Sequence, residues 1–140
     1  MHSVFLGLGS NIGDRRQSIA EAIRLIDERV GTVLRQSTLI ETEPWGFQSD
    51  HRFLNGVILC ETQLSPRRVL RATQRIEREL GRRHKTASSS SERPVYHDRP
   101  IDIDILLYDD LQIDEPDLKI PHPLMQQRDF VMIPLREIQK

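Results

Sequence analysis

The sequence Arg99-Pro-Ile-Asp-Ile-Asp-Ile-Leu-Leu-Tyr108 alternates isoleucine and aspartate within an otherwise apolar run. Its β-branched and aromatic residues favour a strand, in which alternate side chains share a face. The three isoleucines should therefore point to one side of the strand, and Asp102 and Asp104 to the other. With a rise of about 3.3 Å per residue, the two aspartate Cβ atoms lie about 6.6 Å apart, within reach of a shared cation. The alternative is the solvent-facing side of an antiparallel sheet, which alternates in the same way.

Apolar periodicity in the rest of the chain predicts the element order β-α-β-β-α-β. A buried strand at 4–8 leads into a Gly-Ser-Asn turn, and a helix follows from the N-cap Asp14 to Gly31. A second helix begins with Ser65-Pro66 and ends at Gly81. Further strands are predicted at 32–42, 53–62 and 111–113, and a short helical turn at 124–127. This order predicts an α+β fold, a ferredoxin-like sandwich with helices on one face of a largely antiparallel sheet.

The length of 140 residues predicts one domain, 1–140, with mobile loops at about 43–52 and 82–100. The formal net charge of −1 disfavours a globally basic nucleic-acid-binding protein. Cys60 lies within an apolar run and is expected to be a buried small hydrophobic residue. No apolar run approaches about 18 residues, and the N-terminus does not resemble a signal peptide. We therefore expect a cytoplasmic protein that does not bind a membrane.

Positive charge is concentrated between Ser65 and Arg99, where ten Lys or Arg stand against four acids. On the helix these arginines are typical of a solvated face. Arg82 and Arg99, however, border the second loop beside the aspartate pair, and cations next to carboxylates suit polyphosphate transfer. Two carboxylates without clustered Cys or His favour Mg²⁺. Glu77 could supply a further carboxylate or could be a surface i, i+4 partner.

A second group of residues suits a flat heterocyclic ligand. Asn55 lies in an otherwise apolar strand, where a buried amide needs hydrogen-bond partners. Pro44 presents neighbouring backbone groups in a fixed shape. Trp45, Phe53 and Phe130 offer rings that could sandwich a planar molecule.

Eight short motifs run in order along nearly the whole chain: Gly7-Leu-Gly-Ser-Asn11, Glu41-Thr-Glu-Pro-Trp-Gly46, Phe53-Leu-Asn55, Gln74-Arg-Ile-Glu77, Leu80-Gly-Arg82, Arg99-Pro-Ile-Asp-Ile-Asp-Ile-Leu106, Pro121-His-Pro123 and Arg128-Asp-Phe-Val131. Together they resemble the 6-hydroxymethyl-7,8-dihydropterin pyrophosphokinase family of folate biosynthesis. The resemblance implies transfer of the β,γ-pyrophosphoryl group of ATP to the hydroxymethyl oxygen of the dihydropterin, with release of AMP.

The resemblance also implies roles for individual residues. Asp102 and Asp104 would hold two Mg²⁺ ions, and the guanidinium groups of Arg82 and Arg99 would contact phosphate oxygens. The pterin pocket would be lined by Thr42, Pro44, Trp45, Asn55 and Phe130, next to the ring of Phe53. The nucleotide side would be formed by Gln74, Glu77, Ile105, His122 and Arg128. The expected ligands are Mg²⁺, ATP and the pterin, without nucleic acid, membrane or an obligate protein partner.

Two features depart from the family pattern. Tyr96-His-Asp-Arg99 stands where many members have Trp-Gly-Pro-Arg, and His84 stands where many have arginine. Both changes concern the second loop rather than the aspartate pair. Two other functions stay open at this point. One is a ferredoxin-like RNA-binding domain that uses the basic stretch 67–99, although the aromatic-rich strand motif of that class is missing. The other is a family member that has lost catalysis.

Overall fold

The structure, a computed structural model, describes residues 1–42, 52–85 and 100–139, without the side chains of 82–85. Its elements are β1 (His2–Ser10), α1 (Arg15–Arg29), β2 (Gly31–Gln36), β3 (Ile40–Thr42), β4 (Phe53–Thr62), α2 (Pro66–Lys85), β5 (Asp102–Tyr108), β6 (Ile113–Glu115), β7 (Leu118–Ile120), the short 3₁₀ turn η1 (Met125–Gln127) and α3 (Asp129–Ile138). No helix in these ranges is long and apolar enough to cross a membrane.

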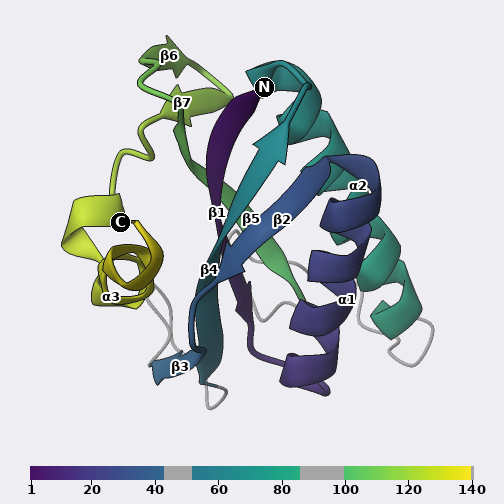
Figure 1. Cartoon of the computed structure of the whole chain (residues 1–140). Coiled ribbons are helices and arrows are strands. Elements are labelled where there is room, and N and C mark those ends of the chain that lie inside the picture. The colour runs from purple at the N-terminus through teal and green to yellow at the C-terminus, as the bar shows by residue number, and fades with distance from the viewer. Residues whose placement is uncertain (43–51, 86–99, 140) are drawn as a thin grey trace.

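The main sheet is antiparallel, with the spatial order β2-β4-β1-β5 and with β3 also paired to β4. Because β2 and β3 both pair with β4, they act as two pieces of one strand of the predicted β-α-β-β-α-β pattern. The ferredoxin-like prediction is therefore confirmed. In this order β1 and β4 are central, whereas β5, which carries the aspartate pair, lies at an edge of the sheet (Figure 1).

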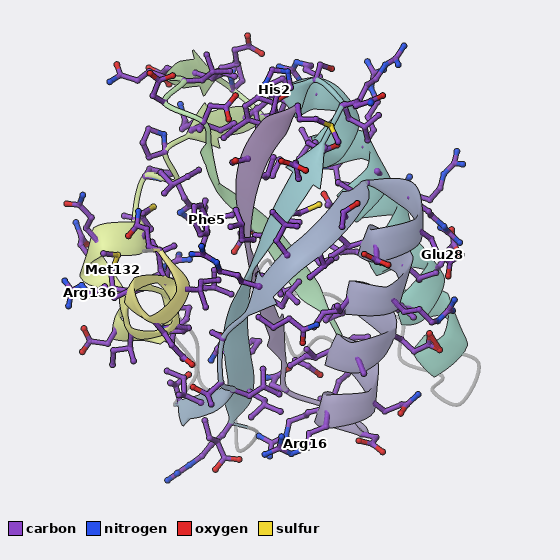
Figure 2. All side chains as sticks on the ribbon, viewed as in Figure 1. His2, Phe5, Arg16, Glu28, Met132 and Arg136 are labelled. Carbon is purple, nitrogen blue, oxygen red and sulfur yellow. The ribbon has the colours of Figure 1, made fainter. Side chains whose placement is uncertain are left out.

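Helices cover both faces of this sheet (Figure 1). The main core lies between the sheet and the pair α1 and α2, whose apolar stripes contribute Ile19, Ile26, Val69, Ile76 and Leu80. A second cluster forms on the opposite face, where α3 packs on Val57 and Leu106. Figure 2 shows Phe5 between the sheet and α3, and Met132 of α3 also packs against this cluster. The cover by α3 was not predicted, because the sequence analysis assigned no element to the apolar run at 130–135.

The helix predictions need one correction. Asp14 is the N-cap of α1, as predicted, and its carboxylate accepts a hydrogen bond from the Gln17 N–H at 3.1 Å. Gly81 does not end α2, which continues to Lys85, so residues 82–85 are helical and the predicted loop begins later. Gly81 does not have a positive φ and therefore fits within the helix. Residues 86–99 and 43–51, on which the rest of the two loop predictions falls, lie outside the described residues.

The strand at 53–62 is as predicted, the strand at 4–8 is longer than predicted, and the strands expected at 32–42 and 111–113 were wrong in extent. β1 continues into the first two residues of the predicted turn, because Gly9 and Ser10 pair with β4. The strand expected at 32–42 is interrupted, because the Ser37 hydroxyl accepts the Val57 N–H at 2.9 Å in place of a backbone carbonyl. The strand expected at 111–113 was placed too early, since β6 starts at Ile113 and forms a hairpin with β7.

Cys60 on β4 provides a test of this packing. The residue is fully buried, as predicted, and burial, with smaller contributions from the Asp27 and Glu61 carboxylates, raises its pKa to about 11. Because the thiolate is the reactive form, we expect a thiol reagent at pH 8 to label the native protein about a hundredfold more slowly than the urea-unfolded chain. Absorbance after addition of Ellman's reagent measures both rates. Equal rates would show that β4 is not covered by α1.

Candidate active site

The aspartate pair lies where the alternation predicted. Asp102 and Asp104 are half-buried, whereas Ile103 and Ile105 between and after them are buried in the core beneath α1 and α2. Both carboxylates therefore project from the other face of the sheet, which carries α3 further along. A bulge follows, because Ile105 pairs with Leu6 and Leu107 with Phe5, leaving Leu106 as the extra residue.

Two glycines of β1 lie directly opposite the aspartates. Gly7 pairs with Asp104 and Gly9 pairs with Asp102, so neither carboxylate has a side chain beside it on the central strand. Opposite residues of an antiparallel pair point to the same face, and the missing side chains leave room there. From the sequence, Gly9 was interpreted as part of a turn, and the space that it leaves beside Asp102 was not predicted. A glycine inside a strand is the signal that could have indicated this space.

Asn55 extends the same row of residues to a third strand. Gly9 pairs with Asn55 on one side and with Asp102 on the other, so the amide and the carboxylate lie across one glycine from each other. Asn55 is 6% exposed, and its Nδ2 donates to Thr42 Oγ1 at 2.7 Å. Phe53, half-buried, pairs with Thr42. The structure thus brings together three of the residues predicted to bind the pterin.

Glu77 reaches the aspartate strand from α2. Its Oε2 accepts the backbone N–H of Ile103, the residue between the two aspartates, at 2.7 Å. Gln74 lies one helical turn earlier on α2 and is exposed. Ile105 contributes only its backbone to this edge, because its side chain is buried in the main core. By the period of two in a strand, the Ile105 N–H points to the same edge as that of Ile103.

His122 and Arg128 also lie near the aspartate pair, in the segment that follows β7. The His122 N–H donates to the Leu106 carbonyl at 3.0 Å, which attaches this segment to β5. Burial lowers the pKa of His122, the positive charge of Arg128 lowers it further, and the negative charge of Asp102 opposes both effects. The imidazole is therefore neutral at pH 7. The Leu124 N–H points to its Nδ1 at 3.4 Å, which leaves the ring proton on Nε2.

Phe130, at the start of α3, completes the described part of the site. Its ring is half-buried, and the Arg128 guanidinium carbon lies 5.6 Å from the ring centroid. Four other predicted site residues are not placed: Pro44, Trp45 and Arg99 lie outside the described residues, and for Arg82 only the backbone, in α2, is described.

Arg15 is a residue near the site that sequence reasoning missed. Its guanidinium donates to Glu41 Oε2 at 2.6 Å and to the Arg52 carbonyl at 2.9 Å. It thereby joins the residues that precede and follow 43–51, next to Thr42. The hydrogen bond and charge of Arg15 hold the pKa of Glu41 below its usual value. Nothing in the sequence links positions so far apart, so this contact could not have been predicted.

The donor set suits Mg²⁺. Within 1–42, 52–85 and 100–139, no group of three or more His, Cys, Asp or Glu side chains could enclose a metal ion. The Asp102 and Asp104 carboxylates are two oxygen donors on one face of β5. Mg²⁺ is commonly held in this way, by one or two carboxylates together with substrate phosphates and water. The two residues fit the ion that the sequence predicted.

Comparisons with known proteins agree with the family resemblance. Residues 5–140 match the profile of the family described as 7,8-dihydro-6-hydroxymethylpterin-pyrophosphokinase (HPPK). A curated relative from Porphyromonas gingivalis, 2-amino-4-hydroxy-6-hydroxymethyldihydropteridine pyrophosphokinase, is 50% identical over 139 residues, which cover 99% of this chain and 91% of the relative. A protein of the same name from Aquifex aeolicus is 42% identical, with 99% and 81% covered.

Solved structures agree on the fold. The crystal structure of wild-type Plasmodium falciparum HPPK-DHPS with SDX-DHP matches 99% of this chain with a TM-score of 0.71 and 15% sequence identity. This chain spans 40% of the length of that protein. At this identity the likeness concerns the fold alone.

The two glycines of β1 predict different responses to alanine. A Cβ on Gly9 would lie 2.9 Å from Asn55 Oδ1, whereas the atoms nearest to a Cβ on Gly7 are those of Leu106, at 3.5 Å. We therefore expect Gly9→Ala to displace the Asn55 amide and to raise the KM for 6-hydroxymethyl-7,8-dihydropterin on the order of tenfold. Gly7→Ala, the matched control, should change it less. Steady-state kinetics and thermal melts separate binding from folding, and equal effects of both variants would contradict this geometry.

Proposed function

The chain belongs to the 7,8-dihydro-6-hydroxymethylpterin-pyrophosphokinase family and catalyses pyrophosphoryl transfer to hydroxymethyldihydropterin in folate biosynthesis, and we propose that ATP is the donor and that the transfer requires Mg²⁺. The observation that carries the proposal is the Asp102 and Asp104 pair, which projects from β5 opposite two glycines of β1. Across Gly9, the next strand of the sheet carries the Asn55 amide. Carboxylates for a cation and polar groups for a heterocycle thus lie in adjacent rows of one sheet face.

In the proposed reaction the hydroxymethyl oxygen attacks the β-phosphorus of ATP in line with the bond from that phosphorus to the α,β-bridging oxygen. That bond breaks as the new one forms, AMP leaves, and the proton of the hydroxymethyl group is released to solvent. Asp102 and Asp104 would hold the Mg²⁺, which would supply positive charge to offset that of the phosphates. Arg82 and Arg99 are proposed to neutralise charge on the transferred group.

The remaining residues are proposed to hold the two substrates. Asn55 and Thr42 would bond the polar edge of the pterin, with Pro44 and Trp45 alongside. The Phe53 and Phe130 rings would stack on its faces. On the nucleotide side we propose Gln74, Glu77, the backbone of Ile105, His122 and Arg128. A neutral His122 can donate from Nε2 to a phosphate oxygen without adding charge.

Product analysis tests the proposed donor. The protein is mixed with ATP, Mg²⁺ and 6-hydroxymethyl-7,8-dihydropterin, and the nucleotide is identified by chromatography. We expect AMP, formed only when the pterin is present and suppressed by EDTA. ADP as the product would mean ordinary phosphoryl transfer, and AMP formation that persists in EDTA would contradict the requirement for Mg²⁺.

Substitution of the aspartates tests the metal assignment. Asp102→Asn and Asp104→Ala should each lower kcat by a factor on the order of 10²–10³ or more, because each removes one carboxylate of the pair. Folding should be retained, since removing one of two neighbouring like charges relieves repulsion. Asp110→Asn makes the same change of charge at an exposed position just beyond β5 and serves as the control. Full turnover in either aspartate variant would exclude the assignment.

A further inference from the structure

The aspartate pair lies on β5, which forms one edge of the sheet in the part of the chain that the structure describes. Among residues 1–42, 52–85 and 100–139, β1 is the one strand that pairs with β5, so the outward backbone groups of β5 need other partners. The Ile103 N–H is one of these groups, and the Glu77 carboxylate accepts it at 2.7 Å. A hydrogen bond to a carboxylate is typically stronger than one between neutral groups.

The backbone of α2 at Glu77 is fixed by core packing of the neighbouring residues. Ile76, the preceding residue, is completely buried in the core, and Leu80 in the next turn of α2 is 7% exposed. α2 therefore presents the carboxylate to β5 from a packed helix. On the sheet side, the Glu77 carboxylate accepts the N–H of the peptide group that joins Asp102 to Ile103, and Asp104 follows Ile103 immediately.

We propose that Glu77 is a positioning residue for the aspartate pair: by anchoring the Ile103 amide it fixes the direction in which Asp102 and Asp104 leave the strand. The inference rests on the proposed function, since it assumes that the pair binds Mg²⁺. The inference gives Glu77 a second role besides the one proposed on the nucleotide side, because its Oε2 atom accepts the Ile103 N–H. Partners of this kind, which orient metal-binding side chains, typically change metal affinity by 10–100-fold when they are lost.

The neighbouring glutamates of α2 allow a matched test. Glu77→Ala removes the acceptor, Glu77→Gln keeps an acceptor oxygen but removes the charge, and Glu79→Ala removes a carboxylate of the same helix that pairs with Arg29 instead. For each variant, hydrogen–deuterium exchange of the Ile103 amide is measured by NMR in the protein without ligands. The Mg²⁺ concentration for half-maximal activity, kcat, the KM for ATP and the melting temperature complete the comparison.

In Glu77→Ala we expect the Ile103 amide to exchange at least about tenfold faster and the half-saturating Mg²⁺ concentration to rise about tenfold. Glu77→Gln should restore most of both values, because its Oε1 can accept the same N–H. Glu79→Ala should leave both unchanged. The KM for ATP should change less than the Mg²⁺ requirement.

Three results would overturn the inference. Unchanged Ile103 exchange in Glu77→Ala would mean that the bond does not hold the strand. A Glu77→Gln variant as defective as Glu77→Ala would mean that the charge acts directly on the metal or the nucleotide. Faster exchange with an unaltered Mg²⁺ requirement would mean that the anchor is purely structural. If the wild-type protein transferred no pyrophosphate, the proposed function would fail, while the exchange measurement would still test the anchor.

Discussion

The antiparallel pairing of β1 with β5 is the constraint on which the site depends. Its register places Gly7 opposite Asp104 and Gly9 opposite Asp102. On the other side of β1, Gly9 pairs with Asn55 of β4. A shift by one residue would turn both aspartates into the core and expose Ile103 and Ile105. The burial of these isoleucines beneath α1 and α2 therefore fixes the direction of the carboxylates.

The two faces of the sheet have different tasks. One face is sealed by α1 and α2, and its core provides the stability that allows polar groups elsewhere. The other face is covered by α3 around Val57 and Leu106 and carries the aspartates, Asn55 and Thr42 further along. Polar groups there are supported from the edges of the sheet, by Glu77 on α2 and by Arg15 on α1. The helices thus stabilise the core and also position the site.

Much of the fold could be predicted, because its signals are local. The Asp14 cap, the apolar stripe through Val69, Ile76 and Leu80, and the alternation at 101–105 each depend on residues a few positions apart. Errors arose where a local signal had two interpretations. Gly9 and Gly81 suggested ends of elements, yet one is paired inside β1 and the other is inside α2. The helix of α3 was missed because the short apolar run at 130–135 contains Pro134.

The sequence by itself determined the chemistry of the site: an aspartate pair on one strand face, an amide in an apolar strand and a set of eight short motifs that contain these residues. Only the tertiary structure decided how these groups meet. The glycines opposite the aspartates, the Glu77 bond to Ile103 and the Arg15 contacts with Glu41 and Arg52 join residues far apart in the chain. Such contacts follow from strand register and helix packing, which arise from burial of the whole core, and no local pattern encodes them.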